Sequence, residues 1–192
     1  MGLTMEDTSP GYAPHDVDVT FDNRYGVCRD KAGLLVAMLR LAGFKAFPVL
    51  IHVGAKLDPE VPQPFFNHAI VAVEEPDAPA ASPAIGKSNN PNDRTVKQYV
   101  LMDPTNENTK DLFPAYLGNN SYLVARPEGE ELRTSPVQAP EENAVTATSS
   151  GTLLKDGSVF LESEIRFDGI NDVAYRGAFV RRKPEDRVKF FE

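Results

Sequence analysis

The sequence predicts an α+β fold, on two observations. Residues 28–42 are apolar on almost every face and are followed by Gly43, a residue type that commonly ends helices. The segments 46–53, 67–74 and 97–103 are short, rich in β-branched and aromatic residues, and bounded by loop-forming stretches, which is typical of strands. One long helix followed by three strands indicates a domain with separate helical and β parts.

The helix over residues 28–42 is the strongest predicted element. Because its apolar residues point in nearly all directions, we expect a central, buried helix. The residues before it show no helical period. Residues 1–20 are predicted to be irregular, with Pro10-Gly11 and Pro14 as breakers, and Asp22 and Asn23 are expected as caps or turn residues.

The strands are separated by two polar, proline-containing stretches. The first strand, 46–53, carries Pro48, which favours its start or an edge position. Residues 54–65 are predicted to be a loop. In the strand 67–74 the residues alternate between two faces, and residues 76–95 are expected to be an exposed excursion. Residues 119–126 are a further candidate strand.

A change in composition divides the chain. Residues 1–126 are predicted to form a core domain whose N-terminal part is incomplete. Residues 127–143 are rich in Pro and Glu and are predicted to be a linker. Residues 144–192 are expected to begin a β-rich C-terminal domain that is truncated. This part opens with a hairpin over 144–167, which turns at Asp156-Gly157, and continues with helices at 170–182 and 184–192.

Composition excludes several classes of function. The chain has 192 residues and a formal net charge of −8, so it lacks the clustered positive charge that nucleic-acid binding requires. No run of 18 apolar residues is present, and we therefore expect no membrane span. A single cysteine excludes an intrachain disulfide and a cysteine cluster for zinc. No phosphate-binding loop or dinucleotide fingerprint occurs.

That single cysteine, Cys28, stands at the beginning of the predicted helix. The first N–H groups of a helix lack intrahelical partners and lie at the positive end of the helix dipole. Both effects favour the thiolate, which is the reactive form of cysteine. Cys28 is therefore predicted to be a nucleophile, although a cysteine without such a context is more often an inert buried residue.

Two later segments supply the groups that a thiol nucleophile needs. His68 begins one predicted strand, and Asp103 ends another directly before Pro104. The imidazole would take the thiol proton and return it to the leaving amine, while the carboxylate would hold the ring in the right tautomer. His52 and His15 are the competing histidines, and we assign both to structural or rim positions. Asn67 is a candidate for lining the substrate cleft.

The three segments resemble the motifs of the transglutaminase-like superfamily. Gly26-x-Cys28-x-Asp30-Lys31 with the apolar helix resembles its cysteine motif, Asn67-His68-Ala69 its histidine motif, and Leu101-Met102-Asp103-Pro104-Thr105 its aspartate motif. The resemblance covers residues 10–126. It implies a papain-like core, in which a helix bearing the nucleophile packs against an antiparallel sheet bearing His and Asp.

The resemblance also implies a function and a setting. It favours acyl transfer on peptide or protein amide bonds through Cys28, His68 and Asp103, with water or an amine as acceptor and with no metal or organic cofactor. Bacterial members carry a β-sandwich domain on either side of this core, and a periplasmic or cell-envelope location follows from the resemblance alone. In family members an upstream aromatic or glutamine side chain often helps to stabilise the oxyanion, and residues 1–27 contain no Trp and no Gln. The donor is then expected either in a missing N-terminal part or as the Cys28 backbone N–H together with another group.

Two other functions compete with acyl transfer. One is a binding or scaffold domain that keeps the fold without turnover, and the missing oxyanion residue favours it. The other is a metal site made of Cys28, His68 and Asp103, since a thiolate and an imidazole can hold zinc. Such sites usually contain more Cys or His, so we rank the metal site last.

Overall fold

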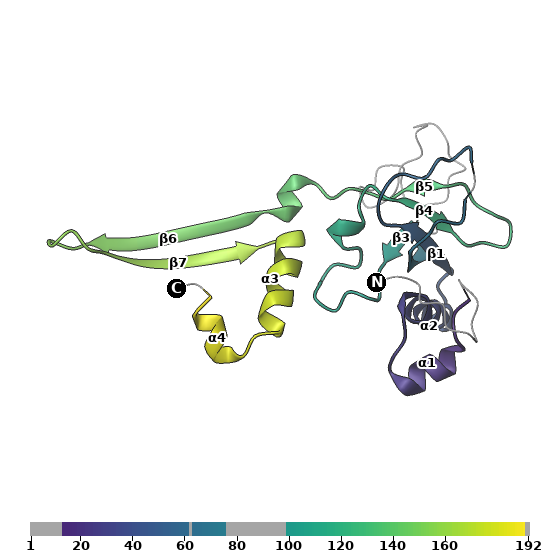
Figure 1. Cartoon of the computed structure of the whole chain (residues 1–192), viewed down its shortest axis with the longest axis horizontal. Helices are drawn as coiled ribbons and strands as arrows, with labels where there is room; N and C mark the ends of the chain where they lie inside the picture. Colours follow the sequence, from purple (N-terminus) through teal and green to yellow (C-terminus); the bar gives the residue numbers. More distant parts are fainter. Residues whose placement is uncertain (1–12, 62, 76–98, 191–192) are drawn as a thin grey trace. The chain divides into compact units, whose positions relative to one another are not determined.

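The computed structural model describes residues 13–61, 63–75 and 99–190, which divide into two units (Figure 1). The first unit contains the described residues up to Glu107 together with Leu112–Val137. The second contains Asn108–Asp111 and the described residues from Gln138 onward. The predicted excursion at 76–95 lies outside the described residues.

A five-stranded antiparallel sheet forms the centre of the first unit. Its strands are β1 (Ala46–His52), β2 (His68–Glu74), β3 (Tyr99–Met102), β4 (Ser121–Val124) and β5 (Arg133–Thr134). They lie in the order β3-β2-β1-β4-β5, and every neighbouring pair is antiparallel. Together with the helices, this arrangement confirms the predicted α+β class. β5 lies within the predicted linker 127–143, so part of that segment belongs to the sheet.

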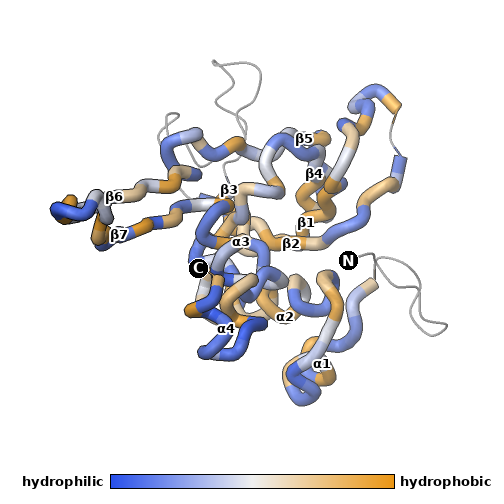
Figure 2. Tube along the Cα trace, turned by 60° about the vertical axis from the view of Figure 1, so that its left-hand side comes forward, coloured by the Kyte–Doolittle hydropathy of each residue, from blue (hydrophilic) through white to orange (hydrophobic). Residues whose placement is uncertain are grey.

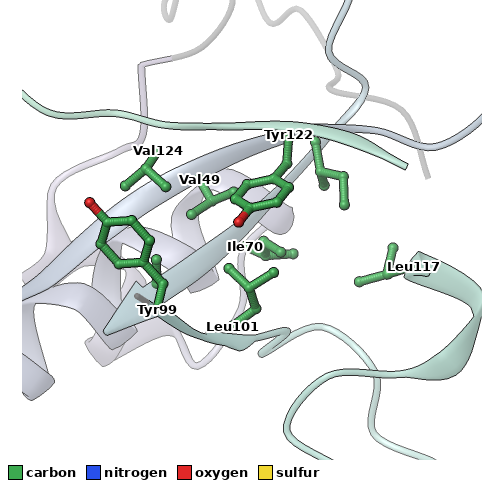
Figure 3. Close-up of a cluster of buried hydrophobic side chains, with 9 residues drawn as sticks. Val49, Ile70, Tyr99, Leu101, Leu117, Tyr122 and Val124 are labelled. Atoms are coloured by element: carbon green, nitrogen blue, oxygen red, sulfur yellow. The ribbon is translucent and has the colours of Figure 1, made fainter. Parts of the chain in front are cut away.

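The two faces of the sheet carry two separate apolar clusters. On one face, the tyrosine cluster gathers side chains from four strands and from the short 3₁₀ helix η1 (Ala115–Leu117) (Figure 3). Its buried members are Val49, Ile51, Ile70, Ala72, Tyr99, Leu101, Leu117, Tyr122 and Val124. Figure 2 shows the hydrophobic residues concentrated along β1 and β4. Because the sheet is apolar on both sides, β2, which lies between β3 and β1, is buried almost continuously.

The other face of the sheet is covered by α2 (Cys28–Leu41), which forms the helix–sheet cluster. The buried members of this cluster are Cys28, Ala32, Val36, Ala46, Ala69, Val71 and Val73. Small residues at helical spacing let α2 lie close to the strands. The predicted burial on all sides was wrong, because Met38 is 53% and Leu41 90% exposed on the opposite side of the helix.

A short helix, α1 (Val17–Asn23), packs against α2 and was missed in the sequence, where this region was predicted to be irregular. Seven residues are too few for a helical period to stand out. Thr20 is its buried residue, and Arg24 ends it in the left-handed conformation (φ 51°). Asn23, which was predicted as a cap or turn residue, is the last residue of the helix.

The second unit contains a hairpin of β6 (Val145–Leu153) and β7 (Val159–Phe167), followed by α3 (Ile170–Val180) and α4 (Pro184–Val188). A 3₁₀ helix, η2 (Pro140–Asn143), precedes the hairpin. The turn differs from the predicted one. The Gly157 N–H donates to the Leu154 carbonyl, so Lys155 and Asp156 are the central residues, and Gly157 follows at φ 85°. The assignment of residues 144–192 to a truncated β-rich domain stays a prediction.

Candidate active site

The carboxylate of Asp30 fixes the backbone that presents Cys28. Asp30 Oδ2 accepts the Val27 N–H at 3.0 Å, and Oδ1 accepts the His15 N–H at 2.9 Å and lies 3.0 Å from His15 Nδ1. A Cβ on Gly26 would lie 2.7 Å from the Cβ of Asp30, so this turn requires a glycine. Asp30 thus joins the start of α2 to the chain fifteen residues upstream.

The thiol of Cys28 is buried between α2 and β2. It interacts with the ring of His68, with the backbone N–H of Ala69 and with that of Arg29. Burial alone would raise the pKa of this thiol. The hydrogen bonds and the charge of His68 outweigh burial, and the pKa of Cys28 is lower than its ordinary value. The site therefore favours the thiolate, as the position at the helix start predicts.

His68 lies between the thiol and the carboxylate of Asp103. His68 Nε2 is 3.1 Å from Asp103 Oδ2, which leaves Nδ1 as the nitrogen for Cys28. Burial lowers the pKa of His68, but its hydrogen bonds to Asp103 and Cys28 and their negative charges raise it to about 9. The structure thus brings the three predicted residues into one chain of interactions, from α2 through the start of β2 to the end of β3.

Asp103 is held by two residues besides His68. Its Oδ1 accepts the backbone N–H of Thr105 at 2.8 Å and the Thr105 hydroxyl at 2.6 Å. Its Oδ2 accepts the Tyr116 hydroxyl at 2.8 Å. Burial raises the pKa of Asp103, but these donors and His68 hold it below its usual range. Thr105 belongs to the aspartate motif, which predicts no separate role for it. Tyr116 could not be found from the sequence, because nothing local connects it with Asp103.

The other residues considered in the sequence lie outside this chain of interactions. The Asn67 side chain accepts the Val53 N–H at 2.8 Å and donates to the Val53 carbonyl at 3.1 Å, so it fastens the loop beside β1. Its role in substrate binding stays a prediction. His52 ends β1 in register with Ser121 on β4. His15 contacts Asp30, which agrees with the structural position expected for it.

A surface pocket of about 400 Å³ lies near the residues that precede Cys28. Its lining comes from α1, the following loop and α2: Thr20, Phe21, Asp22, Arg24, Tyr25, Gly26, Lys31, Leu34 and Met38. Cys28, His68 and Asp103 are not among them. The pocket is therefore a feature of the α1–α2 side of the unit and not the place where the three groups meet.

Within the ranges that the structure describes, no helix is long and apolar enough to cross a bilayer. In the same ranges, no group of three or more His, Cys, Asp or Glu is arranged to hold a metal ion.

A cysteine at a helix start beside a histidine and an aspartate of an antiparallel sheet is consistent with an α+β transglutaminase-like core. Residues 3–73 match the family model described as the transglutaminase-like superfamily. The match supports the resemblance of the motifs, and the matched residues include Cys28 and His68. Asp103 lies beyond the matched residues. No curated protein and no solved structure matches the chain.

Proposed function

We propose that the protein transfers acyl groups from peptide or protein amides through Cys28. The observation that carries this proposal is the continuous chain of interactions from Cys28 through His68 to Asp103. A lone buried cysteine needs no such partners, whereas a nucleophilic thiolate needs a neighbouring cation and a proton carrier.

In the proposed reaction, the Cys28 sulfur attacks the carbonyl carbon of the amide and forms a C–S bond. The carbonyl oxygen takes the negative charge, and the backbone N–H of Cys28, the first residue of α2, is our candidate donor to it. The C–N bond then breaks as His68 gives its proton to the leaving amine, which leaves a thioester on Cys28.

The thioester is then resolved by an acceptor. His68, now neutral, takes a proton from water or from an amine as that acceptor attacks the carbonyl carbon. The C–S bond breaks, and the Cys28 thiolate and protonated His68 are restored. Water as acceptor makes the protein a protease or amidase, and an amine makes it a transglutaminase. Because either acceptor uses the same three groups, the proposal covers both.

Reaction with p-nitrophenyl acetate tests this proposal. We expect one equivalent of p-nitrophenol in a rapid phase, with an acetyl group found on the peptide that contains Cys28. The rate should fall by about 10²-fold or more in His68→Ala, since the positioned acid–base group that keeps Cys28 as a thiolate is lost. His52→Ala is the matched control, a histidine at the end of a neighbouring strand, and should keep the rate.

Adding a primary amine to the acetylated protein separates the two acceptors, because an N-acetylated amine identifies transfer and acetate identifies hydrolysis. A rapid phase that is absent, or that is the same in wild type and His68→Ala, would contradict the proposal and favour a scaffold domain without turnover.

A further inference from the structure

We propose that Tyr116 is a positioning residue that sets the upper pH limit of the Cys28–His68 pair, because it competes with His68 for one oxygen of Asp103. The inference rests on the function proposed above. Tyr116 contacts neither the thiol nor the amide in this account, and it acts only through Asp103.

The geometry at Asp103 puts two donors on one oxygen. Oδ2 lies 2.8 Å from the Tyr116 hydroxyl and 3.1 Å from His68 Nε2, so the neutral hydroxyl makes the shorter contact. Oδ1 is occupied by the two groups of Thr105. The Asp103 side chain has no exposed surface. Since a carboxylate oxygen offers two lone pairs, His68 and Tyr116 divide Oδ2 between them.

The backbone around Tyr116 is held in place from several directions. The side-chain NH₂ of Asn120 donates to the Tyr116 carbonyl at 3.4 Å and to the Gly118 carbonyl at 3.1 Å. The Ser135 hydroxyl donates to the carbonyl of Leu117, between them, at 2.6 Å. The Leu117 side chain is fully buried in the tyrosine cluster. Three consecutive carbonyls are thus bonded by side chains, which anchors the backbone that carries Tyr116.

The direction of the effect follows from the charges that face the pair. His68 is faced by the Cys28 thiol from α2 and by Asp103 from the end of β3. Asp103 is faced by His68 from β2 and by the Tyr116 hydroxyl from η1. A neutral donor on Oδ2 disperses part of the negative charge of the Asp103 carboxylate. It therefore reduces the stabilisation that Asp103 gives to protonated His68. Removing that donor should therefore stabilise the protonated ring of His68. The ion pair between the Cys28 thiolate and His68 should then persist to higher pH.

The test follows the ring of His68 by NMR in protein labelled with ¹³C at histidine Cε1, with His68→Asn used to assign its resonance. In Tyr116→Phe, which keeps the aromatic ring, the pKa of His68 is expected to rise by roughly 0.5–1 pH unit, the effect of one neutral hydrogen bond. Tyr25→Phe is the matched control, because Tyr25 is 78% exposed and should leave the titration unchanged.

A second measurement keeps the inference testable if the Phe variant does not fold. In the wild-type protein, the ¹³Cζ resonance of Tyr116 should shift with the same midpoint as His68. The inference would be overturned if the pKa of His68 stays the same or falls in Tyr116→Phe. It would also be overturned if the Tyr116 resonance does not change as His68 titrates. If wild-type Cys28 reacts as an ordinary thiol, the proposed function fails, and the His68 titration still decides the role of Tyr116.

Discussion

Asp103 determines the state of the other two residues in the site. It is a buried carboxylate with three protein partners. Its hydrogen bond to His68 is the largest effect that raises the pKa of His68, to about 9 despite burial, and its charge adds to that effect. A protonated His68 in turn stabilises the thiolate of Cys28. The ionic state of the thiol thus depends on a side chain 75 residues away in the sequence, counted from position 28 to position 103.

Replacing Asp103 by Asn should therefore change the pH dependence of Cys28. The amide keeps the shape of the carboxylate and loses its charge, so the pKa of His68 should fall towards its ordinary value of about 6.5. Between about pH 6.5 and pH 9, His68 is then neutral and no longer stabilises the Cys28 thiolate. The rate of alkylation by iodoacetamide at pH 7–8 should therefore drop. Asp22→Asn, on the exposed end of α1, is the control and should leave the rate unchanged. An unaltered rate in Asp103→Asn would contradict this account.

At the scale of elements, the decisive contact is between Asp30 and the turn before α2. Three groups from two separate segments meet this carboxylate, and it is buried. The contact does two things at once: it satisfies the N–H of Val27 at the helix start, and it holds the segment around His15 against α2.

Asp30→Ala should lower the free energy of unfolding by about 1–3 kcal/mol, because the partly buried N–H groups of Val27 and His15 lose their acceptor. Denaturation in urea measures this loss, and Asp18→Ala on the exposed side of α1 provides the comparison. We also expect slower alkylation of Cys28 at neutral pH in the folded Asp30→Ala protein, since the first turn of α2 is no longer fixed. If Asp30→Ala is as stable as wild type, the hydrogen bonds of Asp30 do not contribute to the free energy of unfolding.

At the scale of the whole molecule, the candidate site lies within one of the two units. Cys28, His68, Asp103, Thr105 and Tyr116 all belong to the first unit. In the second unit, Gly169 directly precedes α3, and its backbone (φ 57°, ψ −127°) has a conformation found almost only in glycine. A Cβ there would collide with Glu142 and Asn143.

Gly169→Ala should therefore loosen the second unit without altering the chemistry of Cys28. We expect faster amide hydrogen exchange over η2 and α3, and a rate of Cys28 alkylation equal to that of wild type. Val180→Ala, at an exposed position of α3, is the control for the exchange experiment. If Gly169→Ala slows the alkylation of Cys28 as much as His68→Ala does, the site needs both units.

Much of this arrangement could be predicted from local sequence. Cys28 is marked by its place at a helix start, and His68 and Asp103 by their places at strand ends. The position of Tyr116 could not be predicted, because only the path of the chain after β3 brings η1 to Asp103. The helix α1 was missed because seven residues carry too little periodicity. The exposure of Leu41 was missed because apolar composition does not tell which side of a helix the sheet will cover.

The most direct test of the central claim is the pH dependence of Cys28 alkylation by iodoacetamide, in wild type and in His68→Ala. Because the pKa of Cys28 is lowered by His68, the wild-type rate should stay high well below the ordinary thiol pKa of about 8.5. In His68→Ala, the rate at pH 6 should fall towards that of a free thiol. A wild-type rate that follows an ordinary thiol and is the same in His68→Ala would contradict the account, because it would mean that Cys28 and His68 do not form an ion pair.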